Sequence, residues 1–89
     1  MNSGKSWVLD VDPSVYKSLK RFPRKDAERI FFVIDALPRD PFAGDIQKMG
    51  GEEYTWRRRV GAHRIFYELI PHDKTIHIFH VERRTSKTY

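Results

Sequence analysis

The stretch TWRRRVGAHRIFYEL, residues 55–69, contains two strand-like segments joined by a short connection with a glycine. The second segment, Arg64–Leu69, alternates apolar with more polar side chains, which is typical of a strand with one buried face. Thr55–Val60 precedes it, and Gly61-Ala62-His63 suits a hairpin connection. The sequence therefore predicts an antiparallel hairpin. Its expected core side chains are Ile65, Tyr67 and Leu69.

Two helices are predicted before this hairpin. Asp12 is a good N-cap and Pro13 suits the first helical position, so one helix begins here and ends before Pro23. A second helix follows at once, because apolar side chains recur at three- and four-residue spacing until Pro38. Its apolar positions are Ala27, Ile30, Phe31, Ile34 and Leu37. The short break between the helices predicts an antiparallel helical hairpin.

Further strands are predicted at Trp7–Val11 and Thr75–Val81. A long loop is expected at residues 38–53, which contain two prolines and three glycines. The fold class is therefore α+β. An N-terminal strand, a helical hairpin and a three-stranded antiparallel meander form one sheet with the helices on one face. The opposite face stays open for a ligand.

Length and composition indicate a single domain, residues 1–89, with a net charge of +5. Residues 46–89 carry nine basic and five acidic side chains, so +4 of that charge lies there, which favours a polyanion or an acidic partner. The absence of cysteine excludes disulfide frameworks and cysteine nucleophiles. No signal peptide or membrane-length apolar run is visible, so a soluble cytoplasmic protein is expected.

Arginines on the predicted hairpin form the first candidate site, because no acidic residue occurs between Tyr54 and Tyr67. Strand alternation places Arg57 and Arg59 on one face, and Arg64 on the open side of the second strand. Arginine binds phosphate bidentately and keeps its charge. The alternative is an ordinary solvated face on which Glu68 pairs with Arg57 or Arg59.

A second basic cluster closes the sequence, where Arg83, Arg84 and Lys87 precede Tyr89 without an acidic residue among them. A tyrosine beside arginines can offer a ring to a base or a hydroxyl for proton transfer, and the alternative is a frayed basic tail. Lys48, in the predicted loop, is a further candidate for contacting phosphate.

The four histidines show no metal-ligand spacing, so neither a metal nor another cofactor is expected. His77 and His80 lie three residues apart on a predicted strand and are expected to point to opposite faces. His80 shares the strand parity of Arg84, but a half-buried sheet position is favoured for it over the role of a base.

The segments WRRRVGAHRIFYEL (56–69) and IHIFHVERRTSKTY (76–89) resemble the RelE family of toxins, within the RelE/ParE superfamily. The shared pattern is Arg-x-Arg-Val-Gly-x-x-Arg-Ile-x-Tyr-Glu, then a strand ending in Arg-Arg with a tyrosine five residues later. The predicted order of helices and strands matches as well, over nearly the whole chain. The resemblance implies the toxin of a type II toxin–antitoxin system, acting as a metal-independent endoribonuclease, an mRNA interferase.

The resemblance also implies partners and a mechanism. The partners are a cognate antitoxin protein and messenger RNA, cut on the ribosome, with no membrane involved. The RNA 2′-hydroxyl attacks the adjacent phosphate and a 2′,3′-cyclic phosphate forms. By position, Arg64 resembles the phosphate-binding arginine, Arg84 the charge-stabilising arginine and Tyr89 the C-terminal tyrosine that stacks on or orients the substrate. The expected RNA-contacting side chains are Lys48, Arg57, Arg59, Arg83 and Lys87.

The sequence departs from the family pattern at two positions. Thr55 occupies a place where some members have a catalytic lysine, which leaves the general base open, and Arg58 stands where many members carry an aliphatic residue. One alternative function is a ParE-like inhibitor of DNA gyrase, and another is a non-catalytic RNA-binding module of the same fold. The retained Arg64, Arg84 and Tyr89 favour the nuclease.

Overall fold

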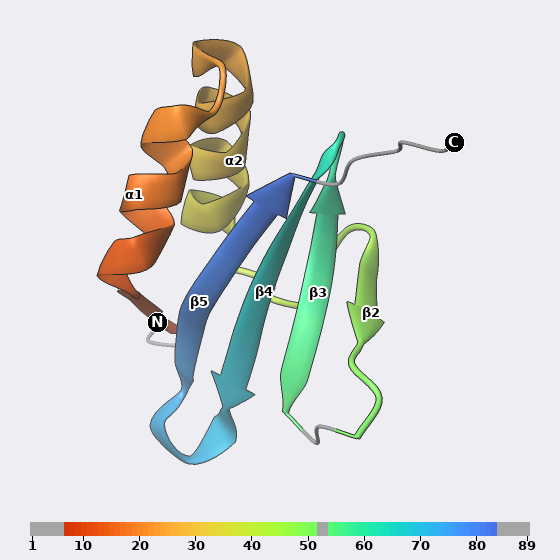
Figure 1. The fold of residues 1–89 in the computed structure, drawn as a ribbon. Helices are drawn as coiled ribbons and strands as arrows, with labels where there is room; N and C mark the ends of the chain where they lie inside the picture. The colour runs from red at the N-terminus through yellow and green to blue at the C-terminus, as the bar shows by residue number, and fades with distance from the viewer. Residues whose placement is uncertain (1–6, 52–53, 84–89) are drawn as a thin grey trace.

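The computed structural model describes residues 7–51 and 54–83, and Arg84, Lys87 and Tyr89 lie outside these ranges. Two α-helices, one 3-10 helix and five strands form its regular structure (Figure 1). In chain order they are β1 (Val8–Val11), α1 (Pro13–Arg21), α2 (Arg24–Ala36), β2 (Ile46–Lys48), β3 (Thr55–Val60), β4 (His63–Ile70), the 3-10 helix η1 (Pro71–Asp73) and β5 (Thr75–Arg83).

The strands form one sheet in the order β1-β5-β4-β3-β2, with β1 parallel to β5 and all other neighbours antiparallel. The predicted α+β class, the N-terminal strand, the helical hairpin and the meander are confirmed. The prediction that residues 38–53 form only a loop is wrong, because Ile46–Lys48 pairs with β3. Three residues are too few to show the alternation of apolar and polar side chains that predicts a strand. This strand forms because the free edge of β3 pairs with it.

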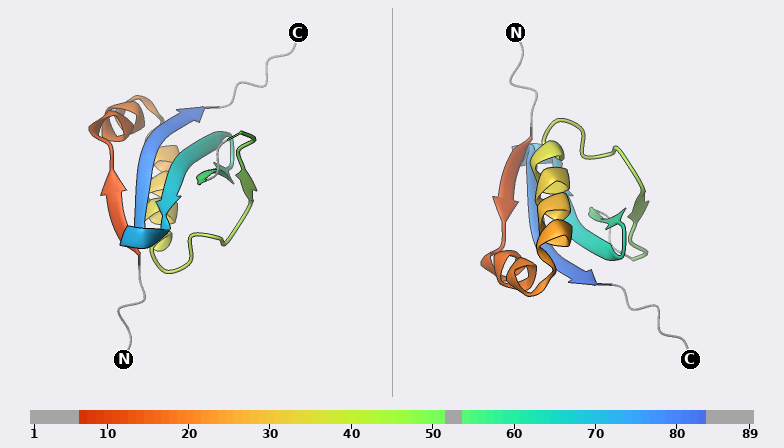
Figure 2. Two further views of the ribbon diagram at one scale, coloured as in Figure 1. Left: turned by 90° about the horizontal axis from the view of Figure 1, so that it is seen from below. Right: turned by 90° about the horizontal axis from the view of Figure 1, so that it is seen from above.

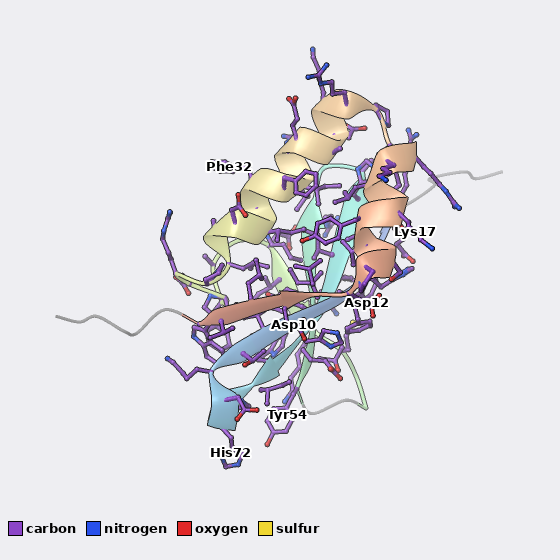
Figure 3. All side chains as sticks on the ribbon, turned by 90° about the vertical axis from the view of Figure 1, so that its left-hand side faces the viewer. Asp10, Asp12, Lys17, Phe32, Tyr54 and His72 are labelled. Carbon is purple, nitrogen blue, oxygen red and sulfur yellow. The ribbon has the colours of Figure 1, made fainter. Side chains whose placement is uncertain are left out.

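Both helices bury their apolar stripes on the same side of the sheet. Asp12 accepts a hydrogen bond from the backbone N–H of Ser14 at 2.9 Å and so caps α1, as predicted. Figure 2 shows α2 running beside β5 and β4, and the segment after it swinging around to β2. Phe32 and Lys17 project outward from the helices (Figure 3). The most deeply buried core side chains are Val15, Ile30, Leu37, Ile65, Tyr67, Ile76, Ile78 and Val81.

Two side chains of the sheet donate hydrogen bonds to the loop between α2 and β2. The Tyr67 hydroxyl, deep in the core, donates a 2.8 Å hydrogen bond to the carbonyl of Pro41. Arg58 reaches the same loop from β3, where its Nη1 donates to the carbonyl of Ala43 at 3.0 Å. Burial raises the pKa of Tyr67 to about 12, so the hydroxyl stays protonated and keeps donating. Arg58, which departs from the family pattern, thus stabilises the loop between α2 and β2 by a hydrogen bond instead of packing in the core.

One irregularity changes the direction of side chains on β5. Phe66 pairs with His80 while its neighbour Tyr67 pairs with Ile78, so Phe79 has no partner on β4 and forms a β-bulge. An extra residue reverses the alternation of the strand beyond it. His77, opposite Glu68, and His80, opposite Phe66, therefore lie on the same face. The prediction that they point to opposite faces is wrong for this reason.

His63 belongs to β4 rather than to the hairpin connection, which consists of Gly61 and Ala62. Its side chain is buried against Phe22, with ring centroids 4.4 Å apart, and its Nε2 has no hydrogen-bond partner within the described residues. Burial lowers the pKa of His63 below its ordinary value of 6.5, with a further lowering by Arg83 and an opposing effect of Asp26. The folded protein therefore prefers neutral His63.

Acidification is expected to destabilise the fold through His63. Below about pH 6.5 the unfolded chain binds a proton that the folded chain resists, so the free energy of unfolding falls as pH drops. His63→Phe should weaken this acid dependence, whereas His72→Gln, at an exposed turn (Figure 3), should retain it. Urea unfolding at about pH 7.5 and 5.5 measures the difference. If His63→Phe loses as much stability between about pH 7.5 and 5.5 as the wild type, other groups cause the acid dependence.

Candidate functional site

Three arginines lie together on the sheet face opposite the helices. Arg59 pairs directly with Arg64 across the β3–β4 hairpin, and Arg57 pairs with Phe66. Residues directly opposite each other in register share a face of the sheet. Ile65 and Tyr67, which alternate with Arg64 and Phe66 along β4, point into the core. This open face, defined by Arg57, Arg59, Arg64 and Phe66 with the facing residues of β5, follows the predicted strand parity.

Arg57 and Arg59 each have a polar partner at the rim of the open face. Arg57 donates a hydrogen bond to the side-chain oxygen of Gln47, and Arg59 Nε lies 3.1 Å from Asp45 Oδ2. The alternative in which Glu68 pairs with Arg57 or Arg59 is not realised. Glu68 Oε1 instead lies 3.4 Å from His77 Nδ1. The acid that faces Arg59 is Asp45, which precedes β2. Because Asp45 lies outside the hairpin, the side-chain pattern of the hairpin could not predict this pair.

Arg64 is more enclosed than Arg59. Its Nη1 lies 3.7 Å from Glu82 Oε2, and its side chain is 25% exposed, compared with 47% for Arg59. Arg64 Nε is covered and has no acceptor within the described residues. The guanidinium thus sits at the centre of the open face with donor capacity left unused, as a binder of an anion would.

Aromatic rings occupy the part of the open face next to Arg64. The Phe66 ring lies 5.4 Å from the His80 ring and 6.4 Å from the Phe79 ring, centroid to centroid. His80 Nε2 in turn lies 3.2 Å from Glu82 Oε1. Neither Glu82 nor Phe66 was proposed as a site residue from the sequence. Strand parity already places Phe66 on the face of Arg64, two positions away, but Glu82 lies beyond the bulge.

The other residues proposed from the sequence are placed differently. Lys48 pairs with Trp56, and Arg83 pairs with the core-facing His63, so register puts both on the face opposite Arg64. Thr55 pairs with Glu68 and is buried at the end of β3. Arg84, Lys87 and Tyr89 lie outside the described residues. Arg57, Arg59 and Arg64 are therefore the proposed site residues that the structure brings together.

Comparison with known families decides the membership of this chain. A family model described as the ParE toxin of the type II toxin–antitoxin system, parDE, matches residues 9–87. The chain belongs to this family. It is therefore a type II toxin of the RelE/ParE superfamily, and the match spans both helices, the arginine-bearing hairpin and all of the sheet except Val8. No curated protein sequence gives a significant match.

Solved structures of other toxins share the fold of this chain. A chain of the RelE–RelB complex from Pyrococcus horikoshii is similar with a TM-score of 0.81 and 24% identity, over 92% of this chain and 99% of that one. A chain of the RelB–RelE complex from Methanococcus jannaschii gives 0.70 and 26%, over 83% and 88%. The isolated Escherichia coli RelE toxin gives 0.77 and 14%, over 92% and 88%.

Two further observations describe the toxin. None of the helices in residues 7–51 and 54–83 is long and apolar enough to cross a membrane. Within the same ranges, no three histidine or acidic side chains gather in a way that could hold a metal ion. Among the described residues, Arg57, Arg59 and Arg64 supply positive charge on the open face.

Proposed function

We propose that this toxin is an endoribonuclease that cleaves messenger RNA on the ribosome. The observation that carries the proposal is the gathering of Arg57, Arg59 and Arg64 on the face opposite the helices. Guanidinium groups on a sheet suit the phosphates of a single RNA strand, because each can donate two hydrogen bonds to one phosphate. The nearby ring of Phe66 suits a base.

In the proposed reaction the 2′-oxygen attacks the adjacent phosphorus, the 5′-oxygen leaves, and a 2′,3′-cyclic phosphate remains. Negative charge grows on the phosphoryl oxygens, and Arg64 is placed to stabilise it. From the sequence resemblance, Arg84 would stabilise charge or the leaving group, and Tyr89 would orient the substrate. Arg57, Arg59 and Lys87 would hold the RNA backbone. Lys48 and Arg83 are not assigned to the site, because their register places them on the other face.

The existing ion pairs of the open face do not oppose this function. The Arg59–Asp45 pair is about half exposed on both sides, at 47% and 63%. Exposed pairs of this kind contribute about 0–1 kcal/mol, so a phosphate can replace the carboxylate at little cost. Arg57 is held by a neutral amide and keeps its full charge for the substrate.

A cognate antitoxin is the second proposed partner. Several of the similar structures are complexes of a RelE toxin with a RelB antitoxin. A basic toxin suits a partner with an acidic or amphipathic segment that folds on contact. Covering the arginines of the open face would remove the charges on which cleavage depends.

Cleavage assays test the proposal directly. Purified toxin is incubated with ribosomes translating a defined messenger RNA and, separately, with the naked RNA, and the new ends are mapped. We expect cuts in the ribosome-bound message that end in a 2′,3′-cyclic phosphate. Addition of the small protein encoded beside the toxin should suppress them. An intact message in both reactions would contradict the proposal.

An inhibitor of DNA gyrase is the second candidate function, favoured by the ParE family model itself. The same preparation is therefore added to gyrase and supercoiled DNA. Trapped cleavage complexes, together with intact messenger RNA, would replace the nuclease by the gyrase inhibitor.

A further inference from the structure

The β-bulge at Phe79 brings a histidine to the centre of the open face. Because of it, His80 pairs with Phe66 and lies on the face of Arg64, with its side chain 50% exposed. One carboxylate joins the two residues. Glu82 Oε1 lies 3.2 Å from His80 Nε2, and Glu82 Oε2 lies 3.7 Å from Arg64 Nη1.

We propose that His80 is the general base of the cleavage reaction and that Glu82 is the residue that positions it. This inference rests on the proposed ribonuclease function and supplies the proton acceptor that Thr55, in place of a lysine, cannot provide. Histidine suits the role because its charge changes near physiological pH.

The contacts of His80 define which nitrogen accepts the proton. When the Nε2–H donates to Glu82, the lone pair of Nδ1 is free, and the carboxylate stabilises the imidazolium that forms. The Phe66 ring, 5.4 Å away and tilted by 45°, packs beside the imidazole and limits its rotation. A phosphate held by Arg64 would lie next to this pair, since Glu82 touches both residues.

The 2′-hydroxyl proton passes to His80 Nδ1 as the bond from the 2′-oxygen to phosphorus forms. The bond from phosphorus to the 5′-oxygen breaks, and the departing oxygen takes a proton from water. His80 then returns its proton to the solvent. Charged groups facing His80 are Glu82 on its own strand, Arg64 on β4 and, across Phe66, Arg57 on β3.

His77 provides a matched control within the same strand. It also lies on the open face and also contacts a carboxylate, with Nδ1 3.4 Å from Glu68 Oε1. Within the described residues, however, Glu68 forms no ion pair with an arginine, so His77 is not linked to the phosphate-binding Arg64.

His80→Gln is expected to lower kcat about a hundredfold or more, the usual contribution of a general base, with little change in KM. Glutamine can still donate to Glu82 but cannot take up the proton. In the wild type, kcat should rise with pH as the imidazole loses its proton and then level off, and this rise should vanish in His80→Gln. His77→Gln should retain both the rate and the rise. The substrate is the RNA that the wild type cleaves.

Glu82→Gln separates positioning from binding. It should lower kcat about tenfold or more, because the imidazole loses its oriented, charged partner. Its KM should stay equal or fall, since a carboxylate that competes with phosphate for Arg64 is gone. A merely structural role would not split kcat from KM in this way. Imidazole added to His80→Ala should restore part of the rate.

The possible outcomes distinguish the inference from the function on which it rests. If the wild type cleaves RNA and His80→Gln keeps its rate and pH dependence, His80 is not the base, although the nuclease stands. Failure of imidazole to restore any activity to a folded His80→Ala protein, as judged by circular dichroism, would equally overturn it. A wild type that cleaves no RNA overturns the proposed function, and the role of His80 falls with it.

Discussion

Arg64→Ala is expected to lower the cleavage rate about a hundredfold or more while the domain remains folded. The side chain lies at the centre of the open face, and its loss removes the charge that, in the proposed reaction, stabilises the phosphoryl oxygens of the transition state. Losing one such donor costs on the order of 3 kcal/mol of transition-state stabilisation. Single-turnover cleavage of ribosome-bound messenger RNA measures the effect, and circular dichroism checks the fold.

Two further variants make the Arg64 result specific. Arg64→Lys keeps a positive charge but loses the planar fork, so its rate should lie between those of wild type and Arg64→Ala. Arg24→Ala removes an arginine of α2 whose side chain is 91% exposed and pairs with Glu28, and it should leave cleavage unchanged. Equal loss in Arg24→Ala and Arg64→Ala would indicate a nonspecific effect of net charge and would remove Arg64 from the site.

Tyr67→Ala is expected to destabilise the domain by about 3–5 kcal/mol, the usual cost of replacing a large buried aromatic side chain with alanine. Tyr67 is 0% exposed and belongs to the central core cluster. A domain of this kind has a total stability of about 5–15 kcal/mol, so the change consumes a large part of it. Urea unfolding followed by the fluorescence of Trp7 and Trp56 measures the loss.

Tyr67→Phe separates the ring of this residue from its hydroxyl. The phenylalanine keeps the packed ring but leaves the Pro41 carbonyl without its 2.8 Å donor, a cost of about 1–3 kcal/mol. The phenylalanine variant should therefore lose less stability than the alanine variant. If both lose the same amount, the bond to the loop before β2, rather than core packing, is what Tyr67 contributes.

Strand parity explains why much of the open face was predictable from sequence. Side chains alternate strictly along a regular strand, so the apolar positions Ile65, Tyr67 and Leu69 were enough to place Arg64 on the opposite side. The sequence signals that predict the helices are equally local. Asp12 with Pro13 marks the start of α1, and Pro23 marks the break between α1 and α2. Each of these signals lies within a few residues of the feature that it predicts.

The errors came from pairings between segments distant in the chain. The strand β2 exists because the edge of β3 is free to pair with it, and residues 46–48 alone carry no such signal. The bulge at Phe79 depends on how β5 fits against β4, and it reverses the side-chain alternation over the rest of β5, His80–Arg83. His80 was therefore assigned the wrong relation to His77.

The sequence by itself determined the α+β class, the helical hairpin and the face on which Arg57, Arg59 and Arg64 lie, because these follow from local geometry and from the burial of apolar side chains. Only the tertiary structure decided the partners of those arginines. Asp45 reaches Arg59 through β2 pairing, and Glu82 reaches Arg64 through the bulged register of β5. Such contacts depend on chain segments brought together by folding, and no pattern within a single strand encodes them.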